Sequence, residues 1–98
     1  MPFMQIVEFH TTDLAPGSAI YDEWEAATEG TRTTRRRLLC QDRNDPTHYF
    51  NIVFFDSYES AMENSNLPET QQFSQQMMAL GEGQPTFHDL DIIHDRDS

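Results

Sequence analysis

The feature that most constrains this chain is the run of residues 47–55, in which nearly every side chain is aromatic or β-branched. Side chains of a strand alternate between its two faces. The apolar residues therefore divide into two sets, Phe50, Ile52 and Phe54 on one face and Tyr49, Val53 and Phe55 on the other. A strand that is apolar on both faces is typical of the centre of a sheet covered on both sides. The sequence predicts such a central strand here.

Three other segments have the composition of strands. Residues 3–10 are rich in strand formers and contain no glycine or proline, and residues 33–41 follow the same pattern despite three arginines. Residues 86–94 alternate between polar and apolar side chains. Turn-forming residues at 42–46 separate the second strand from the third. The chain is therefore expected to have four strands.

A first helix is predicted over residues 18–29, after a loop at 11–17 that contains a proline and a glycine. Ser18 is the expected N-cap, and Gly30 is expected to follow the helix in a left-handed conformation. The buried face is expected from the i, i+4, i+7 spacing of Ile20, Trp24 and Ala27.

The second helical region is predicted in two parts. Asp56 and Glu59 have the spacing of a capping box, which favours a helix that continues to about residue 64. Pro68 cannot extend this helix and is expected to open a new segment at its first position. The apolar face of the new segment is expected to consist of Phe73, Met77 and Leu80. The segment is expected to end at Gly81 and Gly83.

The resulting β-α-β-β-α-β order predicts an α+β, ferredoxin-like fold with a four-stranded antiparallel sheet. Right-handed crossovers place both helical regions on one face of the sheet, although the strands are apolar on both faces. A second copy related by a two-fold axis is the simplest cover for the other face. We expect one domain over residues 1–98, with a frayed polar tail at 95–98, that forms a homodimer.

The charge balance excludes several partners. Seventeen acidic residues oppose six arginines, there is no lysine, and the net charge is -11. Such a chain repels phosphate backbones and anionic lipids, so we expect no nucleic-acid and no membrane partner. No apolar run approaches the roughly 20 residues that span a bilayer. A soluble cytoplasmic protein is expected.

Neither a metal nor a cofactor is expected from the motifs. Cys40, the single cysteine, lies in an apolar run and is interpreted as a small hydrophobic residue. His10, His48, His88 and His94 lack the spacing of a chelating pair, although His10 and His48 would meet if their strands were antiparallel neighbours. The sequence contains no glycine-rich nucleotide-binding motif.

The strand-to-helix passage at 50–61 and the helix restart after 64–68, within this order of elements, resemble the dimeric α+β barrel superfamily, in particular its antibiotic-biosynthesis-monooxygenase-like domains. The resemblance covers residues 3–94. It implies a homodimer whose sheets pack into a barrel, with a pocket between helices and sheet in each subunit. Members include cofactor-free oxygenases of aromatic polyketides and haem-degrading oxygenases. This chain lacks the Asn of the first strand and the Trp and His of region 57–80 that the haem degraders use.

The leading hypothesis is therefore a cofactor-independent monooxygenase-like protein that binds an aromatic or polycyclic small molecule in an apolar pocket. The candidate pocket residues are Trp24, Asn51, Tyr58, Asn64 and His48. Trp24 could instead pack in the core, and Asn51 could be structural. The alternatives are a non-catalytic dimeric barrel module that carries a hydrophobic ligand or serves a stress response, and a purely structural dimer.

A last expectation concerns the subunit interface. The resemblance implies that the fourth strand of one subunit lies near the second strand of the other. Arg35 and Arg37 share one face of the second strand, and Asp89 and Asp91 share one face of the fourth. These four residues are predicted to form a charge ladder between subunits.

Overall fold

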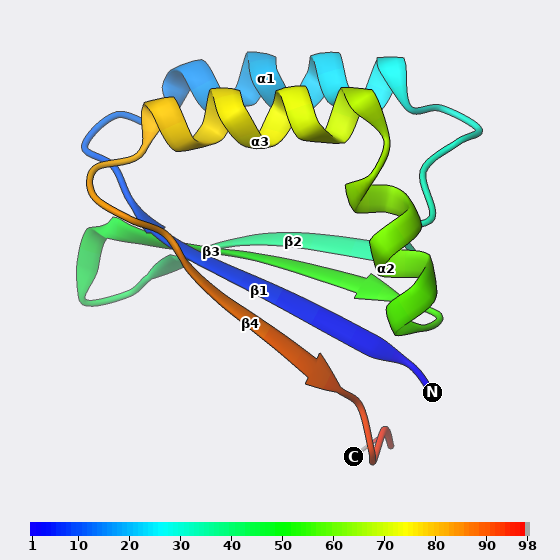
Figure 1. Ribbon diagram of the computed structural model, residues 1–98. Helices are drawn as coiled ribbons and strands as arrows, with labels where there is room; N and C mark the ends of the chain where they lie inside the picture. Colours follow the sequence, from blue (N-terminus) through cyan, green and yellow to red (C-terminus); the bar gives the residue numbers. More distant parts are fainter. Residues whose placement is uncertain (98) are drawn as a thin grey trace.

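A computed structural model describes residues 1–97. Its elements are, in order, β1 (Phe3–His10), α1 (Ala15–Ala27), β2 (Arg36–Asp42), β3 (Asp45–Phe55), α2 (Tyr58–Ser65), α3 (Pro68–Leu80) and β4 (Thr86–Asp91). The four strands form one antiparallel sheet in the order β2-β3-β1-β4. Figure 1 shows α1 and α3 side by side above one face of the sheet, with α2 near one end. The predicted ferredoxin-like fold, with its central β3 and split second helix, is confirmed.

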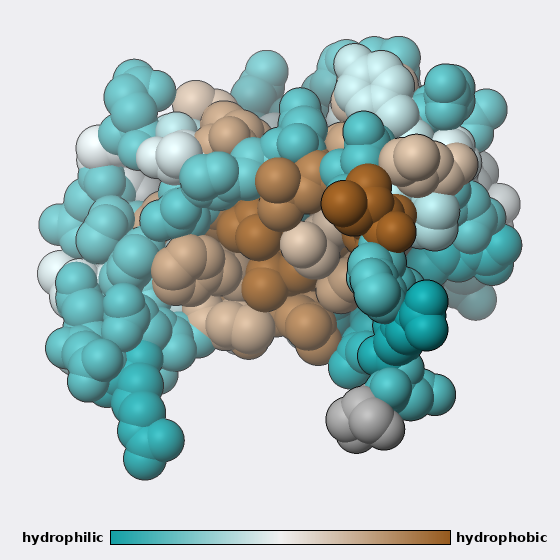
Figure 2. Space-filling view, turned by 90° about the horizontal axis from the view of Figure 1, so that it is seen from below, coloured by the Kyte–Doolittle hydropathy of each residue, from teal (hydrophilic) through white to brown (hydrophobic). Residues whose placement is uncertain are grey.

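The register divides the side chains of the sheet between two faces. Val7 lies opposite Asn51 on the face toward the helices, and Ile6 lies opposite Ile52 on the other face. We call this second face the open face, because none of the helices within residues 1–97 covers it. Its apolar residues are Met4, Ile6, Leu38, Phe50, Ile52, Phe54 and Leu90. In Figure 2 apolar side chains gather at the centre of this face, within a hydrophilic rim.

Helix α1 differs from its prediction. It begins at Ala15, with Leu14 at the N-cap and a proline in its first turn, so Ser18 lies inside the helix. Proline suits this position because its φ is already helical and its missing N–H would have no partner there. Ala27 is exposed, whereas Thr28 is buried and its hydroxyl donates to the Trp24 carbonyl at 2.7 Å. The buried face therefore ends on Thr28 and not on Ala27.

Helix α2 begins with a different cap. Ser57 is the N-cap, and its Oγ accepts the Ser60 backbone N–H at 3.0 Å. Asp56 instead accepts two hydrogen bonds from Arg35, at 2.8 and 2.6 Å. The predicted capping box is therefore wrong: α2 begins at Tyr58, so Ser57 occupies the cap position and Asp56 lies one residue before it. Pro68 opens α3 as predicted.

Several element ends also shift. The hairpin turn before β3 shortens to residues 43–44, β2 begins at Arg36 rather than 33, and β4 ends at Asp91 rather than 94. Gly30 has φ +86°, the left-handed conformation expected after α1. Residues 95–97 of the predicted tail are exposed and form no helix or strand, and residue 98 lies outside the described residues. Among residues 1–97, no helix combines the length and apolar composition needed to cross a membrane.

Candidate functional site

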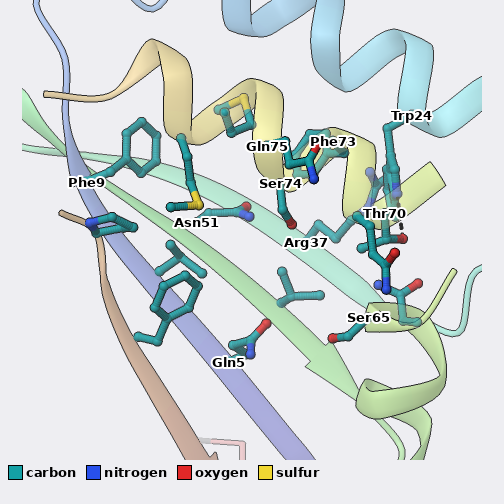
Figure 3. A pocket seen from close by; sticks show the side chains of 18 of the residues that line it. Gln5, Phe9, Trp24, Arg37, Asn51, Ser65, Thr70, Phe73, Ser74 and Gln75 are labelled. Atoms are coloured by element: carbon teal, nitrogen blue, oxygen red, sulfur yellow. Dashed lines mark hydrogen bonds between the residues drawn. The ribbon is translucent and has the colours of Figure 1, made fainter. Parts of the chain in front are cut away.

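A cavity of about 430 Å³ lies between the helices and the sheet. The sheet contributes the apolar side chains of Val7, Phe9 and Val53, and α3 contributes Phe73 and Met77 (Figure 3). The alternation of β1 and β3 explains this wall, because every second apolar residue points toward the helices. The volume falls within the range of small-molecule sites, which are mostly apolar with a few polar groups that orient the ligand.

Three of the five predicted pocket residues line this cavity: Trp24, Asn51 and Asn64. Tyr58 does not, because the first residue of α2 turns outward; its side chain is 49% exposed and packs edge-on against Phe3, with 5.4 Å between ring centroids. His48 does not either. It shares the open face with Ile52, because it lies four positions before Ile52 in β3 and every second residue of a strand has the same face.

Trp24 is 6% exposed, and three groups hold its indole ring in place. Its Nε1–H donates to Thr70 Oγ1 at 3.0 Å, the bond drawn in Figure 3. The ring centroid lies 5.6 Å from that of Phe73 and 4.9 Å from the Arg37 guanidinium carbon. The N–H is thus occupied by Thr70, and the ring can present only its apolar surface to a ligand. Trp24 is both a core residue and a cavity wall.

Two residues that line the cavity each have a buried polar atom with no hydrogen-bond partner within residues 1–97: the hydroxyl oxygen of Tyr21 and Oδ1 of Asn64. Burial raises the pKa of Tyr21 to about 12, against the opposing effect of Arg37, so its hydroxyl remains a proton donor at neutral pH. Buried polar groups normally have partners. Tyr21 was not among the predicted pocket residues, although it lies three positions before Trp24 and therefore on the same helix face.

Arg37 supplies the only charge among the described residues that line the cavity. Its Nη2 donates to Glu25 Oε1 at 2.7 Å, and its side chain is 25% exposed. The lining within residues 1–97 includes no aspartate, glutamate, histidine or cysteine. The cavity therefore offers hydrogen-bond donors and amides to a ligand, and no side chain that is an ordinary general base at neutral pH.

The predicted interface charges have other neighbours. Arg35 pairs with Asp56, and Arg37 pairs with Glu25. Asp89 accepts a hydrogen bond from Gln5 at 3.1 Å, and Asp91 lies opposite Phe3 in the β1–β4 register. The ladder between subunits stays a prediction, because each arginine keeps further N–H donors beside these pairs.

The open face carries a second group of polar residues. Glu8 contacts His88 at 2.6 Å and His48 at 3.1 Å, and His48 also contacts Asp42 at 3.1 Å. His10 stacks on His48 with 4.5 Å between ring centroids, which confirms that these two histidines meet. Hydrogen bonds from His88 and His48 lower the pKa of Glu8, and the bond to Glu8 raises that of His48. Within residues 1–97 no set of three or more such side chains is arranged to hold a metal ion.

The sequence matches no protein-family model and no curated protein. Solved structures do match. A variant of SnoaB, a cofactor-independent oxygenase from Streptomyces nogalater, is similar over 96% of this chain and 95% of its own, with a TM-score of 0.80 and 12% identity. Rv0793 from Mycobacterium tuberculosis has a TM-score of 0.79 at 15% identity, over 99% of this chain and 100% of its own.

A proposed antibiotic biosynthesis monooxygenase from Chloroflexus aurantiacus has a TM-score of 0.73 at 18% identity, over 99% of this chain and 98% of its own. At these identities the likeness concerns the fold. The chain has the fold of the antibiotic-biosynthesis-monooxygenase-like proteins, as the resemblance of its sequence indicated.

Proposed function

We propose that this protein is a cofactor-independent monooxygenase-like protein that holds an aromatic or polycyclic small molecule in the cavity between helices and sheet. The observation that carries the proposal is the cavity itself, whose walls are mostly apolar and whose lining residues Tyr21 and Asn64 each have a buried polar atom with no partner within residues 1–97. A planar ligand with oxygen substituents would fill the walls and satisfy these atoms. The same fold in SnoaB, named as a cofactor-independent oxygenase, supports the assignment.

The lining residues limit the chemistry. No carboxylate or imidazole is found among the described residues of the cavity. The substrate must therefore be acidic enough to lose its own hydroxyl proton without a general base from the protein. An ionised phenol is electron-rich enough to combine with dioxygen directly. The overall change converts phenol and dioxygen to quinone and water: one oxygen atom forms the new carbonyl group, the other leaves as water, and the ring supplies the electrons. The protein would orient the phenol and exclude water.

The functional unit in this proposal is a homodimer. The open face presents aromatic and aliphatic side chains of all four strands, and contiguous apolar surface of this kind marks interaction sites. A second copy related by a two-fold axis would cover this face with an identical one. The helix-facing cavity would lie outside that contact, one in each subunit.

The test combines an oxygen electrode with binding measurements on a panel of hydroxylated naphthalenes and anthrones, in buffer treated with a chelator. We expect oxygen uptake with some panel members and strong loss in Asn64→Ala, with activity kept in the matched variant Asn66→Ala, whose side chain is exposed outside the cavity. Equal activity in the two variants would remove the cavity from the proposal.

Trp24→Phe tests whether Trp24 contributes to ligand binding as part of the cavity wall. Losing the Thr70 bond and part of the ring should lower the free energy of unfolding by about 1–3 kcal/mol. Ligand affinity should fall as well, as measured by calorimetry under conditions where the variant is folded. If stability falls and affinity does not, Trp24 acts as a core residue only.

A second candidate is a non-catalytic carrier of hydrophobic ligands. The lack of a general base among the described lining residues favours it. Binding of panel members without any oxygen uptake would select the carrier.

A further inference from the structure

Two residues with hydrogen-bond donors of different chemistry line the cavity. Tyr21 belongs to α1 and Arg37 to β2. They are close enough for the charge of Arg37 to act on the ionisation of Tyr21. The Tyr21 hydroxyl has no acceptor within residues 1–97.

Arg37 also keeps donors available. A guanidinium has five N–H groups in a fixed plane, and the Glu25 bond uses one of them. The Trp24 ring lies beside the guanidinium (Figure 3), with 4.9 Å between the ring centroid and the guanidinium carbon. Glu25 is partly exposed and does not line the cavity, so its bond to Arg37 lies outside the cavity lining.

We infer that Tyr21 and Arg37 together bind an ionised oxygen of the ligand, so that the cavity selects aromatic anions over neutral aromatics of the same shape. This inference rests on the proposed function and names the substrate class of that site. A carboxylate or an ionised phenol would accept from both groups, and charge-assisted bonds of this kind are about twice as strong as neutral ones.

The experiment uses isothermal calorimetry at pH 7 with two matched pairs of probes. The carboxylate pair is 2-naphthoate and 2-naphthalenemethanol, and the ionised-hydroxyl pair is 2-hydroxy-1,4-naphthoquinone and 1,4-naphthoquinone. We expect the anion to bind at least about tenfold more tightly than its neutral partner in one pair or both. The pair that shows the preference identifies the source of the anionic oxygen.

Three variants assign the preference to residues. In Arg37→Gln the ratio of affinities should fall to near one, and in Tyr21→Phe it should fall about threefold or more. Arg32→Gln is the matched control, because its guanidinium carbon also lies near Trp24, at 5.7 Å from the ring centroid, but the residue does not line the cavity. Its ratio should equal that of the wild type.

Arg37→Gln could fail to fold, since it loses an ion pair and a contact with Trp24. Glu25→Gln therefore provides an independent test: it frees the guanidinium from its carboxylate without altering the cavity lining, so the preference for the anion should increase. A ratio near one in the wild type with both probes bound, or an unchanged ratio in Glu25→Gln, would overturn the inference and leave the proposed function intact. If no probe binds, both are wrong.

Discussion

The face of the sheet that the helices cover and the face that they leave open differ in what their polar groups do. On the covered face, Arg37 and Tyr21 lie at the wall of an apolar cavity, and Tyr21 has no partner within residues 1–97. On the open face, Glu8 and His48 satisfy each other beside an apolar surface. Unsatisfied donors suit a site that receives a ligand, whereas a satisfied network beside apolar surface suits a site that receives a protein.

The comparison also shows where this short chain obtains its stability. Its buried hydrophobic cluster, Phe3, Val53, Phe55 and Ala61, lies on the covered side, and the apolar residues of the open face are exposed or only half-buried. Burial of that open face would therefore add core that one chain cannot form alone.

The largest expected effect is a difference in the free energy of unfolding between variants of two neighbouring phenylalanines. Phe55 is 4% exposed in the core, so Phe55→Ala should lower the free energy of unfolding by about 3–5 kcal/mol at every protein concentration. Phe54 points to the open face, so Phe54→Ala should lower the free energy of unfolding most at the protein concentrations at which the dimer is populated. Denaturant unfolding at two protein concentrations measures both. Concentration-independent losses in Phe54→Ala would argue against a shared interface.

The second prediction concerns a substitution that alters the open face alone. Ile52→Glu places a charge at its centre, and a buried unpaired charge is strongly unfavourable. Dimer affinity should fall by about a hundredfold or more, and light scattering should report a mass near 11.4 kDa in place of twice that value. Leu39→Glu is the control, because Leu39 is exposed and lies on the covered side of edge strand β2. A wild-type protein that is monomeric at micromolar concentration would contradict the homodimer.

The smallest expected effect is a pH dependence of stability from the Glu8 and His48 pair. The pKa of His48 is raised above 6.5, so its contribution is complete below pH 6.5 and is lost as the pH rises through the raised value. Hydrogen bonds from His88 and then from His48 lower the pKa of Glu8 below 4.5, so its contribution is present above pH 4.5 and is lost as the pH falls through the lowered value. Stability from this pair is therefore greatest between about pH 4.5 and 6.5.

The melting temperature measured from pH 5 to 9 should fall modestly above neutrality, and Glu8→Gln should flatten that decline. His94→Gln serves as the control, because His94 is exposed beyond the end of β4. A decline that persists unchanged in Glu8→Gln would assign the pH dependence to other groups.

The candidate site could be predicted only in part. Trp24 was identified from the apolar face of its helix and Asn51 as a polar amide among the aromatic residues of β3, and Asn64 was named from the resemblance; all three line the cavity. His48 was wrongly assigned to the pocket, although it lies three positions before Asn51 in β3 and therefore on the opposite face of the strand. The role of Arg37 was also missed, since its contact with Trp24 joins a strand and a helix that local spacing does not relate.

The sequence by itself determined the order of the elements, the two apolar faces of β3 and the restart of the second helix at Pro68. These features depend on side-chain periodicity and on the fixed φ of proline, which act over a few residues. Only the tertiary structure decided that Ser57 rather than Asp56 caps α2, with Asp56 paired instead to Arg35. It also decided which polar atoms lack a partner, since that depends on how helices and sheet pack across a cavity.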